Sequence, residues 1–88
     1  MTLAVKFDPE AWDDYLYWQK TDKDLAKRIN ELITATQRDP FVGIGKPEPL
    51  KHAFAGWWSR RINDEHRMVY RAKNETIEIA KLRYHYSA

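Results

Sequence analysis

The chain has 88 residues, of which 43% are hydrophobic and 14% aromatic, and its formal net charge is +2. This length predicts one domain over residues 1–88. The sequence contains no cysteine, which excludes disulfides, thiolate catalysis and cysteine-based zinc sites. No stretch approaches the roughly 20 apolar residues of a membrane span, and the N-terminus lacks the apolar run of a signal peptide. We therefore expect a cytoplasmic protein that does not contact a membrane.

The beginning of the chain predicts a strand followed by a helix. Apolar side chains alternate with others over residues 2–7, which indicates a strand. Asp8 then suits the N-cap and Pro9 the first position of a helix that ends near Lys20. The side chains expected to face the core follow helical spacing: Trp12, Tyr15 and Leu16, with Tyr17 and Trp18 widening the stripe.

A second helix is predicted between Thr21 and Pro40. Thr21 is expected to be its N-cap, with Asp24 at the capping-box position, and Pro40 ends it. Its apolar side chains recur at the spacing of one helical face, while the opposite face is charged and expected to be solvated. The residues of the apolar face are Leu25, Ile29, Leu32, Ile33 and Thr36.

The second half of the chain predicts a loop and three strands. Residues 39–52 hold three of the four prolines and two of the three glycines, which is typical of a loop. The strands follow at residues 57–62, 67–73 and 77–86 and are joined as antiparallel hairpins. This order of elements predicts an α+β fold, with two helices on one face of a mainly antiparallel sheet and the other face left for function.

The last predicted strand, Ile77–Tyr86, has an unusual face. Side chains alternate between the two faces of a strand, so Lys81, Arg83 and His85 are expected to lie together. Neighbouring cations repel one another unless an anion lies over them. We therefore predict that this face binds phosphate, and specifically the phosphate of RNA.

The predicted turns bring further arginines to that face. Directly opposed residues of antiparallel strands share a face, so a three-residue turn between the first two strands of the hairpins places Arg61 with Arg67. A second three-residue turn, Asn74–Thr76, places Arg67 on the same face as the cations of the last strand, which are Lys81, Arg83 and His85. Arg60 and His66 fall on the apolar side in this scheme, and the pattern gives them no role beyond exposure at an edge.

These residues fit a metal-free cleavage of RNA. Such a reaction needs a base for the 2′-hydroxyl proton, an acid for the departing 5′-oxygen and cations for the phosphoryl charge. The imidazole of histidine titrates near neutral pH, so His85 is the candidate acid. Arg61 and Arg67 suit bidentate contacts with phosphate. The candidate base is Glu48, because the prolines on either side of it restrict its backbone.

The remaining candidates have supporting roles. They are Lys51, Arg83 and Tyr86, with Trp57 as a further ring on which a base can stack. Each assignment has a plainer alternative: spacing alone favours Glu48 as an ordinary exposed loop acid, His85 can be a surface histidine, and the arginines can be solvated strand residues. Three scattered histidines without cysteine give no metal-ligand spacing, so we expect no metal and no cofactor.

Several segments, taken together, resemble a known family over nearly the whole chain. They are WDDYLYWQKTDK (12–23), INELI (29–33), GKPEPLKH (45–52), WSRRI (58–62), EHRMVY (65–70) and RYHY (83–86). The set is similar to the YoeB/Txe-type mRNA interferase toxins, which belong to the RelE superfamily of bacterial type II toxin–antitoxin systems. Ser87 and Ala88 extend beyond the usual terminal aromatic residue of that family.

The resemblance implies a RelE-like fold, similar to microbial ribonucleases, and a ribosome-dependent endoribonuclease. Such an enzyme cuts mRNA in the ribosomal A site and inhibits translation. The resemblance implies that Glu48 is the general base, that His85 is the general acid and that Arg67 stabilises the phosphate. It also matches positions that support the site, namely Lys51, Arg61 and Tyr86.

The implied products are a 2′,3′-cyclic phosphate or 3′-phosphate and a 5′-hydroxyl. The implied partners are a YefM-type antitoxin, the ribosome with its rRNA and A-site mRNA, and a second copy of the toxin in a homodimer. Two alternatives remain open on the sequence. One is a related toxin that acts by binding, for example on a topoisomerase, and the other is a non-catalytic RNA- or protein-binding module.

Overall fold

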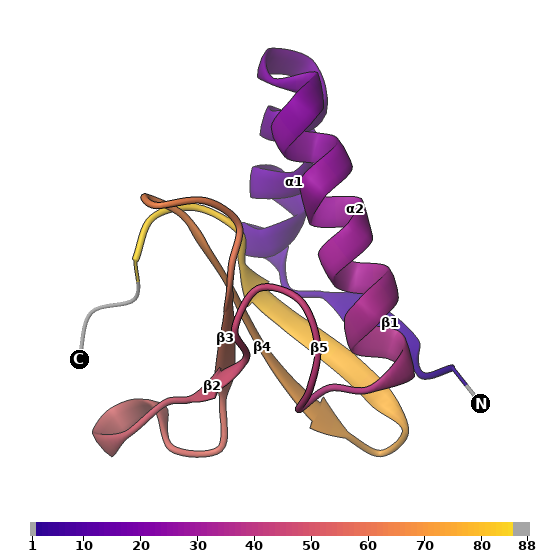
Figure 1. Cartoon of the computed structure of the whole chain (residues 1–88), viewed down its shortest axis with the longest axis vertical. Coiled ribbons are helices and arrows are strands. Elements are labelled where there is room, and N and C mark those ends of the chain that lie inside the picture. Colours follow the sequence, from indigo (N-terminus) through magenta and orange to yellow (C-terminus); the bar gives the residue numbers. More distant parts are fainter. Residues whose placement is uncertain (1, 86–88) are drawn as a thin grey trace.

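The computed structural model of the chain describes residues 2–85 and has an α+β architecture (Figure 1). The strands form one sheet in the order β1-β5-β4-β3-β2, in which β1 runs parallel to β5 and the other neighbouring pairs are antiparallel. The predicted fold class is therefore confirmed. The elements in chain order are β1 (Ala4–Phe7), α1 (Pro9–Thr21), α2 (Lys23–Arg38), β2 (Glu48–Pro49), the 3₁₀-helix η1 (His52–Phe54), β3 (Trp58–Arg61), β4 (Arg67–Lys73) and β5 (Thr76–Lys81).

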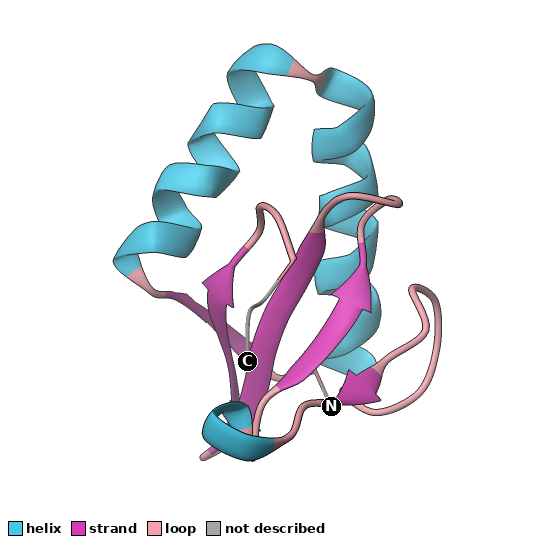
Figure 2. Ribbon diagram, turned by 90° about the vertical axis from the view of Figure 1, so that its left-hand side faces the viewer, coloured by secondary structure: helices cyan, strands magenta, loops and turns pink. Residues whose placement is uncertain are grey.

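The two helices lie side by side as an antiparallel pair and cover one face of the sheet (Figures 1 and 2). They carry the chain from β1 at one edge of the sheet to β2 at the other edge. Over residues 2–85, neither helix is both long and apolar enough to cross a membrane. Among the described residues, no α-helix lies on the opposite face of the sheet, and we call it the uncovered face.

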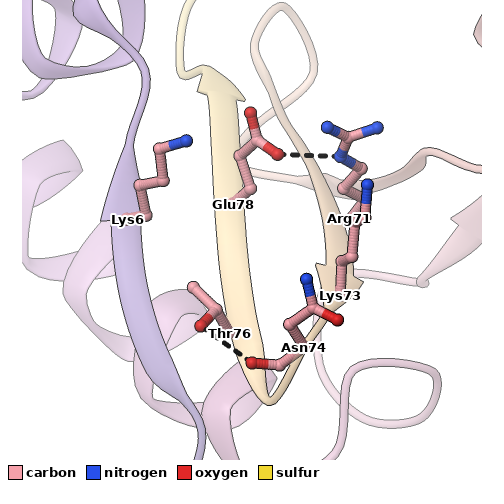
Figure 3. Close-up of a pocket in the computed structure, with 6 residues that line it drawn as sticks. All are labelled: Lys6, Arg71, Lys73, Asn74, Thr76 and Glu78. Atoms are coloured by element: carbon pink, nitrogen blue, oxygen red, sulfur yellow. Dashed lines mark hydrogen bonds and ion pairs between the residues drawn. The ribbon is translucent and has the colours of Figure 1, made fainter.

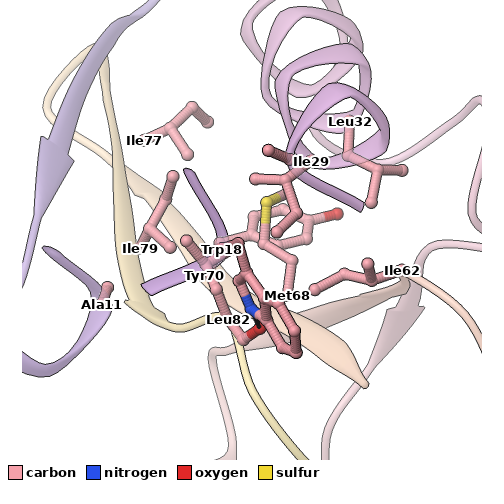
Figure 4. Close-up of a cluster of buried hydrophobic side chains, with 11 residues drawn as sticks. Ala11, Trp18, Ile29, Leu32, Ile62, Met68, Tyr70, Ile77, Ile79 and Leu82 are labelled. Carbon is pink, nitrogen blue, oxygen red and sulfur yellow. Dashed lines mark hydrogen bonds between the residues drawn. The ribbon is translucent and has the colours of Figure 1, made fainter. Parts of the chain in front are cut away.

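Helix α2 presents the apolar face that its spacing predicts. Ile29, Leu32 and Thr36 are fully buried, and Leu25 and Ile33 are half-buried. These side chains meet residues of α1 and of the sheet in a single core between helices and strands (Figure 4). The buried hydrophobic residues of this core are Ala11, Trp18, Ala26, Ile29, Leu32, Ile62, Met68, Tyr70, Ile77, Ile79 and Leu82.

The stripe predicted for α1 is confirmed for Trp18, which is buried, and for Tyr15, which packs against the core, but it is wrong for its other residues. Trp12 and Leu16 are each 46% exposed, and the buried residues of this helix are Ala11, Asp14 and Trp18. The helix is turned this way because two of its polar atoms bind the backbone just after β5. The Asp14 carboxylate accepts from the amide of Leu82 at 2.9 Å, and the indole of Trp18 donates to the Leu82 carbonyl at 2.9 Å.

The junction between the helices also differs from the prediction by one residue. Asp22 is the N-cap of α2, and its carboxylate accepts from the amide of Leu25 at 3.1 Å. Thr21, the predicted cap, is instead the last residue of α1, where its hydroxyl donates to the carbonyl of Tyr17. Aspartate and threonine are both good N-caps, so the local sequence alone does not distinguish these two starts.

The first β-hairpin has the predicted parity. Arg61 is directly opposite Arg67, and the amide of Ile62 donates to the carbonyl of His66 at 3.0 Å, which leaves three residues in the turn. The prediction that the two arginines share a face is therefore confirmed. The second hairpin differs, since its turn has two residues, Asn74–Glu75, both with positive φ. Such φ values fit the tight turns that join twisted antiparallel strands.

A bulge in β5 returns Lys81 to the face that the predicted three-residue turn would have given it. Ile79 is opposite Tyr70, but Lys81 is opposite the adjacent Val69, so Ala80 is one residue in excess. Ile77 and Ile79 therefore point into the core, whereas Lys81 points to the uncovered face. The predicted strand over residues 77–86 is wrong at its end, because β5 stops at Lys81 and the next residues bend towards α1.

Arg60 lies on the apolar side of β3 as predicted, but at 0% exposure it is not at an exposed edge. Its guanidinium donates to the carbonyls of Asp39, Val42 and Ile44 and to the hydroxyl of Tyr70. The Tyr70 hydroxyl in turn donates to the Pro40 carbonyl. This network ties the loop after α2 to the centre of the sheet, and that loop leads into β2.

Candidate functional site

The uncovered face of the sheet carries a carboxylate and several cations in register. Glu48 on β2 is opposite Ser59 on β3, Ser59 is opposite Val69 on β4, and Val69 is opposite Lys81 on β5. Directly opposed residues lie on the same face, about 5 Å apart. We call these four residues the middle row. The row connects Glu48 at one edge of the sheet with Lys81 on the strand next to the other edge.

Arg61 and Arg67 lie on the same face two residues further along their strands, about 7 Å from the middle row. The guanidinium of Arg67 is held by its own hairpin, since Nη1 donates to the carbonyls of Asn63 at 2.7 Å and His66 at 3.1 Å. The register thus brings the predicted base, Glu48, and the two predicted phosphate-binding arginines to one part of the uncovered face.

The segment that carries His85 runs beside this pair. The amide of Arg67 donates to the carbonyl of Tyr84 at 3.1 Å, and His85, which is exposed, follows directly. The amide of Tyr84 donates to Nδ1 of His66 at 2.7 Å. With the two bonds that Asp14 and Trp18 make to Leu82, the backbone before His85 is fixed at several points. Tyr86, the other predicted residue of this segment, lies outside the described residues.

Arg83 is placed elsewhere. Its guanidinium lies over the ring of Tyr17 on α1 at 3.9 Å and donates to the hydroxyl of Tyr84 at 3.0 Å. Arg83 therefore does not lie with Arg61 and Arg67. The predicted alternation does not apply to it because β5 ends two residues earlier.

The loop before Glu48 approaches the core closely. The amide of Arg61 donates to the carbonyl of Gly45 at 2.6 Å, and a Cβ on Gly45 would meet Cδ2 of Leu32 at 2.8 Å. Gly45 also has φ +82°, so a side chain is disfavoured there on both counts. Lys51, the supporting residue predicted three positions after Glu48, is exposed at the start of η1.

A further row of side chains lies on the uncovered face, on the other side of the middle row. The guanidinium of Arg71 donates to the Glu78 carboxylate at 2.8 Å and lies 4.5 Å from the ring centroid of Trp57. Lys6 on β1 is next to Glu78 (Figure 3). We call these four residues the lower row. Part of it, together with the β4–β5 turn, lines a pocket of about 260 Å³.

The carboxyl group of Asp8 meets the lower row from the start of α1. Burial raises the pKa of Asp8 above its ordinary value, and its hydrogen bond and repulsion with Glu78 raise it further. The pKa of Glu78 is lowered, chiefly by the hydrogen bond from Arg71. Asp8 makes no side-chain cap to α1, although it occupies the N-cap position. Its carboxyl is therefore committed to the sheet and not to the helix.

Asp8→Asn is expected to stabilise the chain against urea at pH 7 and to have less effect at pH 3. Because the folded-state pKa of Asp8 is raised, the wild-type chain loses stability as pH rises through that pKa, and asparagine cannot ionise. Asparagine also keeps the N-cap preference. Urea unfolding curves at both pH values measure this difference. Asp13→Asn, on the exposed side of α1, is the matched control, and an equal gain from Asp8→Asn at both pH values would contradict the prediction.

The sequence reasoning missed the residues that hold the C-terminal segment. Asp14 and His66 are buried and bind its backbone, and neither was assigned this role. One signal was present, since Ala11, Asp14 and Trp18 have the spacing of one helical face and so predict a buried acid. Within residues 2–85, no group of three or more acidic or histidine side chains is arranged to hold a metal ion.

The fold and this face define a class of small α+β proteins, in which two helices cover one side of a mixed, mostly antiparallel sheet. A family described as YoeB-like toxin of bacterial type II toxin-antitoxin system matches residues 7–86. The chain belongs to this family. A curated relative, "Toxin YoeB" of Escherichia coli strain K12, is 62% identical over 84 residues, which cover 96% of this chain and all of the relative.

Solved structures agree with this membership. The YoeB dimer from Staphylococcus aureus superposes with a TM-score of 0.90 at 47% identity, and the heterotetrameric YoeB–YefM complex from the same species with 0.88 at 47%. Each match covers 98% of this chain and all of the matched chain. The toxin–antitoxin complex RelBE2 from Mycobacterium tuberculosis is only 23% identical, with a TM-score of 0.72 over 97% of this chain and all of that chain, and shows the shared RelE-like fold.

Proposed function

We propose that this toxin is a ribosome-dependent endoribonuclease that cuts mRNA in the ribosomal A site without a metal ion. The observation that supports this most is the grouping of Glu48, Arg61 and Arg67 on the uncovered face, with the backbone before His85 bonded to Arg67. A carboxylate that acts as the base, guanidinium groups that bind the phosphoryl oxygens and an imidazole that acts as the acid are the parts that suit attack by a 2′-hydroxyl.

In the proposed reaction, Glu48 removes the proton from the 2′-hydroxyl of the nucleotide before the cut. The 2′-oxygen attacks the phosphorus, and the bond from phosphorus to the 5′-oxygen breaks. His85 gives a proton to that 5′-oxygen as it leaves. Arg67 and Arg61 bind the phosphoryl oxygens, on which negative charge increases in the transition state. The products are a 2′,3′-cyclic phosphate, which water can open to a 3′-phosphate, and a 5′-hydroxyl.

The remaining candidates support this reaction in different ways. Lys51 provides a cation near the edge of the sheet that carries Glu48, and it would attract the RNA backbone. Arg83 lies against Tyr17, so its proposed role is to hold the segment before His85 against α1. Tyr86 is proposed to support the imidazole or to stack on a base.

The partners of this toxin are proposed from its relatives. Because the Staphylococcus aureus protein is found both as a dimer and in a complex with YefM, we expect a homodimer and a YefM-type antitoxin here. The substrate is mRNA on translating ribosomes, which also provide rRNA contacts. This substrate places the toxin's action in the cytoplasm, where it would inhibit translation.

A single 2′-deoxynucleotide at the cut site is expected to block cleavage, because the attacking 2′-oxygen is then absent. The site is first located by toe-printing of a translated message with and without the toxin, and the expected cut lies within the A-site codon. The same message with the deoxynucleotide one codon downstream is the control and should be cut normally. Cleavage of the substituted site would overturn the mechanism. Inhibition of translation without any cut would favour a toxin that acts by binding.

A further inference from the structure

Tyr84, the residue before the proposed acid, has an unusual backbone. Its φ is +61°, in the left-handed region that a large side chain rarely adopts. Such a conformation persists where the surrounding structure enforces it, and it is frequent at functional sites. The side chain of Tyr84 is 53% exposed, so its burial does little to enforce the conformation. The backbone of Tyr84 therefore needs partners of its own.

Two consecutive residues, where the first hairpin turn meets β4, bind Tyr84 on both sides of its Cα. The amide of Tyr84 donates to Nδ1 of His66 at 2.7 Å, and its carbonyl accepts from the amide of Arg67 at 3.1 Å. The rotations about the N–Cα and Cα–C bonds lie between these two contacts, so the pair restrains φ and ψ together. The carbonyl belongs to the peptide that continues into His85. The two contacts thus set the direction in which the chain leads to His85.

The imidazole of His66 is held in the structure as an acceptor. The residue is 6% exposed, and its ring contacts Trp18, at 4.8 Å between ring centroids, and Tyr84, at 5.4 Å. Nδ1 can accept only in a neutral ring whose proton is on Nε2. An oxygen of Glu65 lies 3.5 Å from Nε2, the nitrogen that carries this proton. The turn also holds the backbone of His66, because its amide donates to Oδ1 of Asn63 at 2.7 Å.

We propose that His66 is a positioning residue for cleavage: it holds Tyr84 in the left-handed conformation and thereby directs His85 at the scissile phosphate. The inference rests on the proposed function, in which His85 is the acid. When the hydrogen bond to Nδ1 is lost, Tyr84 can relax to a negative φ, and the chain then leads His85 elsewhere. A displacement of about 1 Å at a reacting group can cost about 100-fold in rate. His66 itself transfers no proton to the substrate, since its ring is buried and its Nδ1 is occupied.

His66→Phe and His66→Asn separate the effect of the acceptor from that of the ring. Phenylalanine keeps a ring against Trp18 but has no acceptor, so single-turnover cleavage of a translated message is expected to slow by about 10–100-fold. The side-chain oxygen of asparagine is as many bonds from the backbone as Nδ1 and can accept in its place. Asparagine should therefore restore the rate to within about threefold of wild type, although it leaves a cavity beside Trp18 and is less stable in urea than the phenylalanine variant. A purely structural role would instead make the rate follow stability.

A double-mutant cycle tests whether His66 acts through His85. In the His85→Gln background the acid is already absent, so adding His66→Phe should change the remaining rate by less than about twofold, whereas two independent effects would multiply. Ile77→Val is the control for a weakened fold. Ile77 is fully buried in the core and does not belong to the segment that carries Tyr84. Its variant loses stability with one methyl group and should still cut at the wild-type rate.

A measurement on the wild-type toxin tests the contact without any change at His66. Nitrogen-15 NMR of the histidine rings at pH 8 shows which ring nitrogen carries the proton. The signals of His66 are identified by elimination with His52→Gln and His85→Gln. They are expected to show a neutral ring with its proton on Nε2. A proton on Nδ1 would overturn the inference, because that nitrogen could not then accept from Tyr84.

The possible results distinguish this inference from the proposed function. Slow cleavage by both single variants, no further loss in the double variant and recovery by asparagine would support the positioning role. Slow cleavage by His85→Gln together with wild-type cleavage by His66→Phe would overturn the positioning role and leave the proposed ribonuclease standing. Wild-type cleavage by His85→Gln would overturn the proposed acid, and the positioning role with it.

Discussion

His85→Gln is expected to lower the rate of mRNA cleavage by about 10²–10⁴-fold, the usual contribution of a general acid. Glutamine has a similar size and can donate a hydrogen bond, but it cannot give up a proton to the leaving 5′-oxygen. Because His85 is exposed, the substitution should leave the fold and ribosome binding intact. Single-turnover cleavage of a translated message, with ribosome co-sedimentation alongside, measures both quantities.

His52→Gln is the matched control for this experiment. His52 is also an exposed histidine, but it belongs to η1 and not to the segment that adjoins Arg67. Its variant should cut within about twofold of the wild-type rate, since surface substitutions of this kind change little. If the His85 variant cuts as fast as the control, the imidazole has no chemical role and the proposed mechanism is wrong.

Arg60→Met is expected to lower the free energy of unfolding by about 2–4 kcal/mol, because buried carbonyls that lose their donor cost about 1–3 kcal/mol each. Arg60 is fully buried and donates to three carbonyls of the loop that leads to Glu48. Methionine fills a similar volume and removes the desolvation cost of the charge, which limits the loss. Urea unfolding followed by tryptophan fluorescence gives the free energy.

Arg38→Met makes the same chemical change at the exposed end of α2 and should alter stability by no more than about 0.5 kcal/mol. The comparison separates the loss of buried hydrogen bonds from the general effect of removing one positive charge. An Arg60 variant as stable as the Arg38 variant would show that the loop does not depend on this network. Its retained cleavage activity would show that Glu48 is positioned by other contacts.

Local rules were sufficient where one short-range feature decides the outcome. The apolar spacing of α2 placed Ile29 and Leu32 in the core, and the parity of the first hairpin placed Arg61 opposite Arg67. A helical face and a tight turn are both set by residues that are near in sequence. The segments that resemble a known family additionally predicted the fold and the family to which the chain belongs.

Predictions from the local sequence were wrong where residues that are far apart in the sequence contact one another. The orientation of α1 depends on Asp14 and Trp18 meeting the backbone of Leu82, 68 and 64 residues away in the sequence. The same contacts end β5 early and turn the chain, so the alternation that placed Arg83 beside His85 does not continue. Arg60, on the apolar face of β3, was expected at an exposed edge, because its four hydrogen-bond acceptors lie in a loop and a neighbouring strand that its local sequence does not reveal.

By itself, the sequence determined which elements form and which residue types are available for chemistry, because both follow from patterns within a few residues. The tertiary structure decided which of those residues meet. Strand register brought Glu48 to the face of Arg61 and Arg67, and a one-residue bulge turned Lys81 towards them. Register and bulges result from the packing of whole elements against one another, and that packing energy is shared among contacts that no short stretch of sequence contains.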